Sequence, residues 1–167
     1  MSRVRSLALA VLLLTVAVAI HVGSAARYVR VLTVRTEDGQ LFEAFPVVPG
    51  DSFSLSYVHS IYGAPAEERF LIDEHDRLRL VAINSASQAV LEYYGPGAGD
   101  PSIVPSVAVL PVIADRIGQR TLEIAGRRLP LYRFGDGVHL RLQVERWSPW
   151  RSRLVWASLR TGAAGRP

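Results

Sequence analysis

One short stretch of this 167-residue chain combines residue types that could carry chemistry. His59 and Ser60 end an alternating segment, and Glu68 belongs to the segment that follows. If residues 53–59 and 68–73 pair as the two strands of a hairpin, His59 lies directly opposite Glu68 at the rim of an apolar face. A carboxylate in that position would favour the charged imidazole and orient its ring, as a general base or a metal ligand requires.

Three interpretations of this histidine–glutamate pair remain open. It could be a buried polar pair that fixes strand register, a ligand site, or a catalytic pair with His59 as base and Glu68 as orienting group. A metal site needs a third ligand, and nothing in the sequence places His75 or His139 nearby. We therefore expect no metal and no cofactor. The chain has no Gly-x-Ser-x-Gly motif, which gives a serine hydrolase little support.

A glycine-rich stretch, GPGAGDP at residues 95–101, is the second candidate feature. It lacks the Gly-Lys-Ser/Thr of a phosphate-binding loop. Bare backbone at Gly97 and Gly99 would instead let a ligand approach closely. The predicted ligand-binding residues are His59, Ser60, Glu68, Gly97 and Gly99.

Arginine and tryptophan alternate in the run RWSPWRSR at residues 146–153. Both residue types favour protein interfaces, and tryptophan also favours membrane interfaces. A partner or membrane surface is one interpretation. The alternative is that the tryptophans close one end of the core while the arginines stay solvated. The residues of the predicted surface are Arg146, Trp147, Trp150, Arg151 and Arg153.

The elements that must position these residues are short strands. Ser52 to Tyr57 alternates serine with large apolar residues, which indicates a half-buried strand. Asp38-Gly39 between two apolar segments is a strong hairpin signal. About ten short strands joined by frequent turns predict an all-β domain, a small antiparallel sandwich or barrel. The predicted strands include residues 29–35, 41–47, 53–59, 67–73, 78–83, 121–124, 129–132, 138–144 and 154–159, with 88–94 as a further possible strand.

An apolar leader precedes this domain. Arg3 and Arg5 come before an apolar run that covers residues 7–20, or 7–22 with His21 and Val22, and small residues suited to signal peptidase follow. Residues 1–26 are thus expected to be a signal peptide or a membrane anchor, 27–160 a single β domain, and 161–167 a flexible tail. Either form of the leader places the domain outside the cytoplasm, periplasmic or at the outer face of the cytoplasmic membrane.

The charge distribution and the absence of cysteine narrow the chemistry further. Without cysteine, disulfides, thiol catalysis and zinc–thiolate sites are excluded. Residues 26–115 hold 6 arginines against 12 acidic residues, whereas residues 116–167 hold 11 arginines against 3. The two halves could attract each other on folding, or the basic half could face anionic lipid or an acidic partner. Export argues against nucleic acid as a partner, and none is expected.

Part of the chain resembles a known bacterial family. Phe45 to Phe53, then Tyr57-Val58-His59-Ser60-Ile61, Pro65, Glu68 and the run Gly97 to Pro101 are similar to the domain of unknown function 1850 family. The resemblance covers roughly residues 45–101. Tyr57 and Phe70 stand where members of that family often carry tryptophan. The family consists of small exported proteins often encoded beside TRAP-type transporter components, so the resemblance implies an accessory role in solute uptake.

From these observations we expect an exported accessory or ligand-binding domain rather than an enzyme. Its partner would be a membrane transporter subunit or a small-molecule solute, with membrane association through residues 7–22. Two alternatives remain open. One is an extracytoplasmic hydrolase or lyase that uses His59 and Glu68. The other is a structural partner of a membrane complex that docks through the arginine–tryptophan surface.

Overall fold

The computed structural model describes Thr15, residues 28–94 and residues 106–163, without the side chains of the last six. These residues form two antiparallel sheets. The first has the strand order β2 (Leu41–Pro46), β1 (Val29–Thr36), β9 (Val138–Trp147) and β6 (Val109–Ala114). The second has the order β5 (Leu78–Ser85), β4 (Pro65–Ile72), β3 (Ser52–Val58), β7 (Thr121–Ile124) and β8 (Arg127–Pro130).

The alternation in the sequence positions β3 as expected. Phe53, Leu55 and Tyr57 are buried, and the serines between them lie on the opposite face. The hairpin at Asp38-Gly39 is also confirmed, since β1 pairs with β2 and Gly39 has a φ of 92°. That backbone conformation suits glycine, which has no Cβ to clash.

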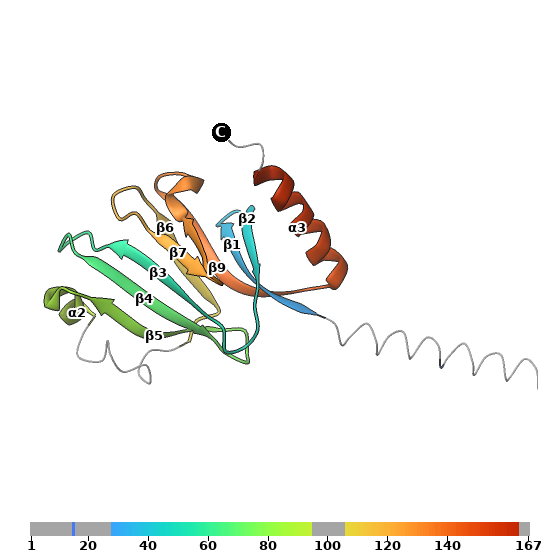
Figure 1. Ribbon diagram of the computed structural model, residues 1–167, viewed down its shortest axis with the longest axis horizontal. Coiled ribbons are helices and arrows are strands. Elements are labelled where there is room, and N and C mark those ends of the chain that lie inside the picture. The colour runs from blue at the N-terminus through green and yellow to red at the C-terminus, as the bar shows by residue number, and fades with distance from the viewer. Residues whose placement is uncertain (1–14, 16–27, 95–105, 164–167) are drawn as a thin grey trace, which may run out of the picture.

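One core lies between the two sheets, and a second lies on the outer face of the four-stranded sheet. Leu32 and Val34 of β1 join Phe53 and Ile72 of the five-stranded sheet in the first core. Val31 faces the other way and packs with Ala44, Trp147, Val155 and Trp156 in the second. The last two belong to α3 (Pro149–Ala163), which covers this face and lies beside β1 and β2 in Figure 1.

Two predicted strands are helical instead. The segment 88–94 contains α2 (Gln88–Tyr93), and the expected strand 154–159 is part of α3. Pro149 fits the first turn of a helix, where its missing N–H costs nothing. Buried Ser152 and partly buried Val155 and Trp156 then recur at helical spacing. A short apolar run does not by itself distinguish a strand from a helix.

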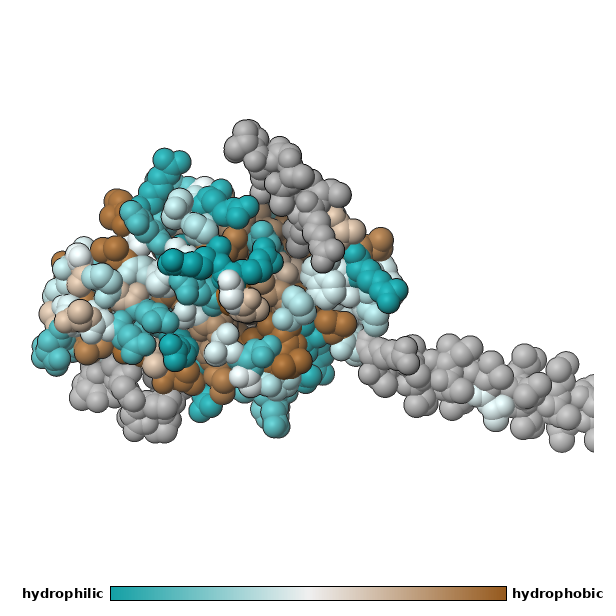
Figure 2. Space-filling model, viewed as in Figure 1, coloured by the Kyte–Doolittle hydropathy of each residue, from teal (hydrophilic) through white to brown (hydrophobic). Residues whose placement is uncertain are grey.

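The described part of the chain therefore contains nine strands, not ten, with a 3₁₀ turn, η1 (Leu131–Phe134), between β8 and β9. α3 extends to Ala163, three residues into the segment expected to be a tail. Within the described residues, no helix has the length and apolarity needed to span a membrane. Except for Thr15, the leader expected at residues 1–26 lies outside the described residues. Hydrophilic side chains cover much of the face seen in Figure 2, with apolar residues showing in smaller groups.

Candidate functional site

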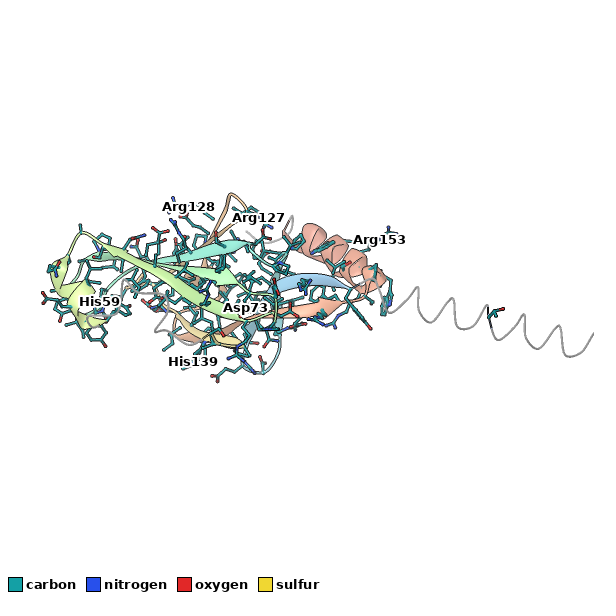
Figure 3. The ribbon with its side chains drawn as sticks, turned by 90° about the horizontal axis from the view of Figure 1, so that it is seen from below. His59, Asp73, Arg127, Arg128, His139 and Arg153 are labelled. Atoms are coloured by element: carbon teal, nitrogen blue, oxygen red, sulfur yellow. The ribbon has the colours of Figure 1, made fainter. Side chains whose placement is uncertain are left out.

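His59 lies directly after β3, at the end of the molecule opposite Arg153 of α3 (Figure 3). Its backbone closes a tight turn, because His59 N–H donates to the Ala64 carbonyl at 2.8 Å and Gly63 N–H donates to the His59 carbonyl at 2.8 Å. His59 thus faces Ala64, and Glu68 pairs with Leu55. The predicted register, with His59 opposite Glu68, is wrong.

The error comes from the residues assigned to the turn. Proline, alanine and glutamate at 65–67 suggest a loop, but β4 begins at Pro65 and these residues pair with β3. Proline is tolerated at the first position of a strand, where its missing N–H breaks no ladder bond. His59 and Glu68 nevertheless lie on the same side of the hairpin, as expected, because both contact Tyr94.

Glu68 binds two tyrosines. Its Oε1 accepts hydrogen bonds from the Tyr57 hydroxyl at 2.7 Å and from the Tyr94 hydroxyl at 2.9 Å. The two hydroxyls also contact each other, and because they carry only two protons, two of these three contacts are hydrogen bonds at any one time. No hydrogen bond joins His59 to Glu68 in the part of the chain that the structure describes. The catalytic interpretation requires the Glu68 carboxylate to orient the imidazole. The structure does not show this contact.

Both tyrosines stay protonated in this arrangement. Burial, together with the hydrogen bonds to Tyr94 and Glu68 and the negative charge of Glu68, raises the pKa of Tyr57 far above its usual range. Burial also raises the pKa of Tyr94, and the charge of Glu68 acts in the same direction. The hydroxyls are therefore hydrogen-bond donors across the physiological pH range.

Aromatic rings surround His59. Its ring centroid lies 5.2 Å from that of Tyr62, 4.9 Å from that of Tyr93 and 6.3 Å from that of Tyr94, the last two in edge-on geometry. The residue is only 6% exposed. Its Nδ1 atom is buried and has no hydrogen-bond partner among the described residues. An unpaired buried nitrogen costs roughly 1–3 kcal/mol, so it calls for an explanation.

Arg120 completes the cluster from the loop that precedes β7. Its guanidinium carbon lies 4.5 Å from the centre of the Tyr57 ring, a cation–π contact. Its Nε is likewise buried without a partner among the described residues. The loop is held at the end of β3 by a 2.8 Å hydrogen bond from Val58 N–H to the Gly118 carbonyl. Two unsatisfied nitrogens therefore belong to residues that contact the same tyrosine cluster.

Of the three other residues predicted to bind a ligand, the structure describes only Ser60. Ser60 is exposed in the turn after His59. Gly97 and Gly99 lie outside the described residues, although in sequence they follow Tyr94 closely. Among the described residues, no group of three or more histidine, cysteine or acidic side chains could hold a metal ion. Figure 3 places His139 well away from His59.

Sequence reasoning missed four tyrosines and one arginine of this cluster. The alternating pattern places Tyr57 only on the apolar face of its strand, and its hydroxyl contact with Glu68 follows from the true register. Tyr93-Tyr94, a pair of adjacent tyrosines just before the glycine-rich stretch, is a signal that could have indicated the cluster. Nothing local in the sequence links Arg120 to Tyr57, which is 63 residues away.

The predicted arginine–tryptophan surface is only partly a surface. Trp147 is 1% exposed and lies in the core beneath α3, so its assignment to a surface is wrong. Its indole N–H donates to Glu145 Oε2 at 2.7 Å, which explains how a strand-end tryptophan can be buried completely. Trp150 is 67% exposed, and Arg153 is also exposed.

The two remaining arginines of this set have structural partners. Arg146 Nε lies 2.5 Å from Asp76 Oδ2, and Arg30 Nε lies 2.5 Å from the other oxygen of the same carboxylate. Asp76 thereby ties the β4–β5 turn to the four-stranded sheet. Arg151 stacks on the Trp147 ring, with 4.9 Å between its guanidinium carbon and the ring centre.

Glu145 is the most heavily bonded carboxylate of this region. It accepts from Arg35 Nε at 2.6 Å, from Gln143 Nε2 at 3.0 Å and from the Trp147 indole. Burial alone would raise the pKa of Glu145, but these hydrogen bonds outweigh burial and lower the pKa to about 2. A group with a lowered folded-state pKa stabilises the protein above its ordinary pKa, and this contribution is lost as the pH falls.

We expect Glu145→Gln to lower the free energy of unfolding at pH 7 by about 2 kcal/mol, because Arg35 loses its charged partner. The difference between variant and wild type should shrink as the pH falls from 4.5 towards 2. Urea unfolding of both proteins at a series of pH values measures this difference. Glu123→Gln, which removes the half-exposed partner of Arg128, is the control and should change stability by less than about 1 kcal/mol. A difference in the free energy of unfolding between Glu145→Gln and the wild type that does not depend on pH would contradict the ion pair.

Comparison of the chain with known proteins found no match to a family model, to a curated protein or to a solved structure.

Proposed function

We propose that this chain is an exported accessory domain that binds a small polar solute at the cluster of His59, Tyr57, Glu68, Tyr94 and Arg120. The observation that carries this proposal is a pair of buried nitrogens, His59 Nδ1 and Arg120 Nε, that have no hydrogen-bond partner in the part of the chain that the structure describes. Both belong to residues in contact with the tyrosines that bind Glu68. A ligand that forms hydrogen bonds with these two nitrogens would offset the cost of burying them.

The chemistry of the cluster favours a compact ligand that carries a hydrogen-bonding or anionic group. Arg120 can donate to a carboxylate, and His59 can donate or accept according to its protonation. The rings of Tyr62 and Tyr93 can contact an apolar or planar part. Tyr62 is 44% exposed and Tyr93 is 58% exposed, so an entering molecule meets them first.

The place of action and the partner follow from the leader and from the family resemblance. The apolar run at residues 7–22 would carry the domain across the cytoplasmic membrane and either be removed or tether it there. The resemblance to the domain of unknown function 1850 family adds a solute transporter of the TRAP type as the partner. In this proposal the domain serves solute uptake from the outer face of the membrane.

A purely structural role in a membrane complex is the second candidate. Trp150 and Leu154 lie one helical turn apart on α3 and are 67% and 64% exposed, which is unusual for large apolar side chains. A partner could cover them. The hydrolase or lyase interpretation is less well supported, because Glu68 binds the tyrosines rather than His59.

Side-chain NMR of the four histidines tests the proposed ligand site. The full-length chain in detergent micelles would be titrated with small carboxylic acids, amino acids and amines, and the imidazole signals followed. We expect at least one compound to shift the His59 signals and to leave those of His75 and His139 in place. If every compound moves all the signals alike, or none, the proposed site is wrong.

A further inference from the structure

A pocket lies on the outer face of the four-stranded sheet, beside the first turn of α3. Its volume is about 450 Å³. It is remote in the fold from the His59 cluster, which belongs to the five-stranded sheet and α2. The side chains that determine its charge are Arg35 of β1, Arg141 and Glu145 of β9, and Arg151 of α3. Three arginines thus face one glutamate.

Arg35 and Arg141 are direct partners in the β1–β9 register. Directly opposed residues of an antiparallel pair project from the same face of the sheet, with Cβ atoms roughly 5 Å apart. Two like charges in this position repel each other and destabilise the pair. The arrangement therefore needs a compensating negative charge.

Glu145 compensates only one of the two. Arg35 binds it through Nε at 2.6 Å and Nη2 at 3.2 Å, and the remaining Arg35 nitrogen, Nη1, donates to the Gly39 carbonyl at 2.7 Å. Thr33 and Gln143 also donate to the same carboxylate. Arg35 and Glu145 are thus fixed in place and satisfied by each other.

Glu145 leaves the positive charges of Arg141 and Arg151 largely uncompensated. The side chain of Arg141 makes no hydrogen bond and no ion pair with the described residues, although its backbone belongs to the β9 ladder. Arg151 approaches Glu145 only to 3.9 Å, although its stacking on Trp147 holds it over the pocket. Among the described residues, two guanidinium groups with unpaired donors therefore border this pocket, and its one carboxylate, Glu145, is already bound to Arg35.

We propose that this pocket binds a phosphate group, held between Arg141 and Arg151. Planar guanidinium groups donate two parallel hydrogen bonds to phosphate oxygens, which makes arginine the usual residue for this task. The bound anion also reduces the electrostatic repulsion between Arg35 and Arg141. The phosphate is either free in solution or part of a glycerol phosphate headgroup, since the same donors recognise both.

Calorimetric titration of the full-length chain, in a non-ionic detergent, tests the site with inorganic phosphate and with glycerol 3-phosphate. Ionic strength is kept constant with sodium chloride so that screening does not change. We expect Arg141→Gln to weaken phosphate binding at least tenfold. Arg128→Gln removes the same charge from an exposed position on β8 and should leave binding within twofold of wild type.

The relative affinity of the two probes identifies the source of the phosphate. Tighter binding of glycerol 3-phosphate supports a headgroup, and tighter binding of inorganic phosphate supports the free anion. In the absence of either, Arg141→Gln should melt at or above the temperature of the wild type, because the like-charge pair is gone. The proposal is overturned if neither probe binds. Equal weakening by both substitutions also overturns it, since the attraction would then be one of net charge.

Discussion

Replacing Trp147 with alanine is expected to lower the free energy of unfolding by roughly 3–5 kcal/mol, because a large buried side chain is lost. Trp147 is 1% exposed and packs with Val31 and Ala44 between the four-stranded sheet and α3. Its removal leaves a cavity and deprives Glu145 of a 2.7 Å hydrogen bond. The stacking partner of Arg151 is lost as well.

Urea unfolding followed by circular dichroism measures this effect, and Trp150→Ala is the matched control. Trp150 is 67% exposed, so its loss should change stability by less than about 1 kcal/mol. Trp147→Phe should fall between the two, because it keeps most of the packing and loses the indole N–H. Equal effects of Trp147→Ala and Trp150→Ala would contradict the burial of Trp147 under α3.

Two substitutions of His59 are expected to separate packing from polar function. His59→Ala should cost about 2–4 kcal/mol, because the tyrosines around the ring lose their contacts. His59→Phe retains a ring of similar shape and removes the unpaired Nδ1. It should therefore leave stability unchanged or raise it by about 1 kcal/mol.

Thermal and urea unfolding of both variants check this expectation, with His139→Phe as a control at an exposed histidine. A large loss of stability in His59→Phe would mean that the imidazole nitrogens are needed for folding. His59 would then have a structural role, and its buried Nδ1 would no longer indicate a ligand.

The sequence predicted those features that depend on neighbouring residues. Alternation identified the buried face of β3, and Asp38-Gly39 identified the first hairpin. The antiparallel, mostly β character followed from the number of such segments. α3 was missed because the positions that face the sheet, buried Ser152 and partly buried Val155 and Trp156, include a serine and so do not form an apolar stripe in the sequence.

The candidate site depends on contacts between distant segments, which cannot be inferred from neighbouring residues in the sequence. His59 and Glu68 were recognised and share a face, but Pro65 at the start of β4 shifted the register from the one expected. The tyrosine that follows α2 and binds Glu68, and the arginine over Tyr57, come from distant segments. Such contacts are set by the way the sheets and loops pack.

The measurement that tests the ligand site most directly compares the thermal midpoints of the wild type and of His59→Phe across a panel of small carboxylic acids, amino acids and divalent metals. The full-length chain in detergent micelles would be used. We predict that at least one compound raises the midpoint of the wild type and has no effect on a His59→Phe protein that is equally stable without it. If no compound distinguishes the two proteins, the cluster around His59 is not a binding site.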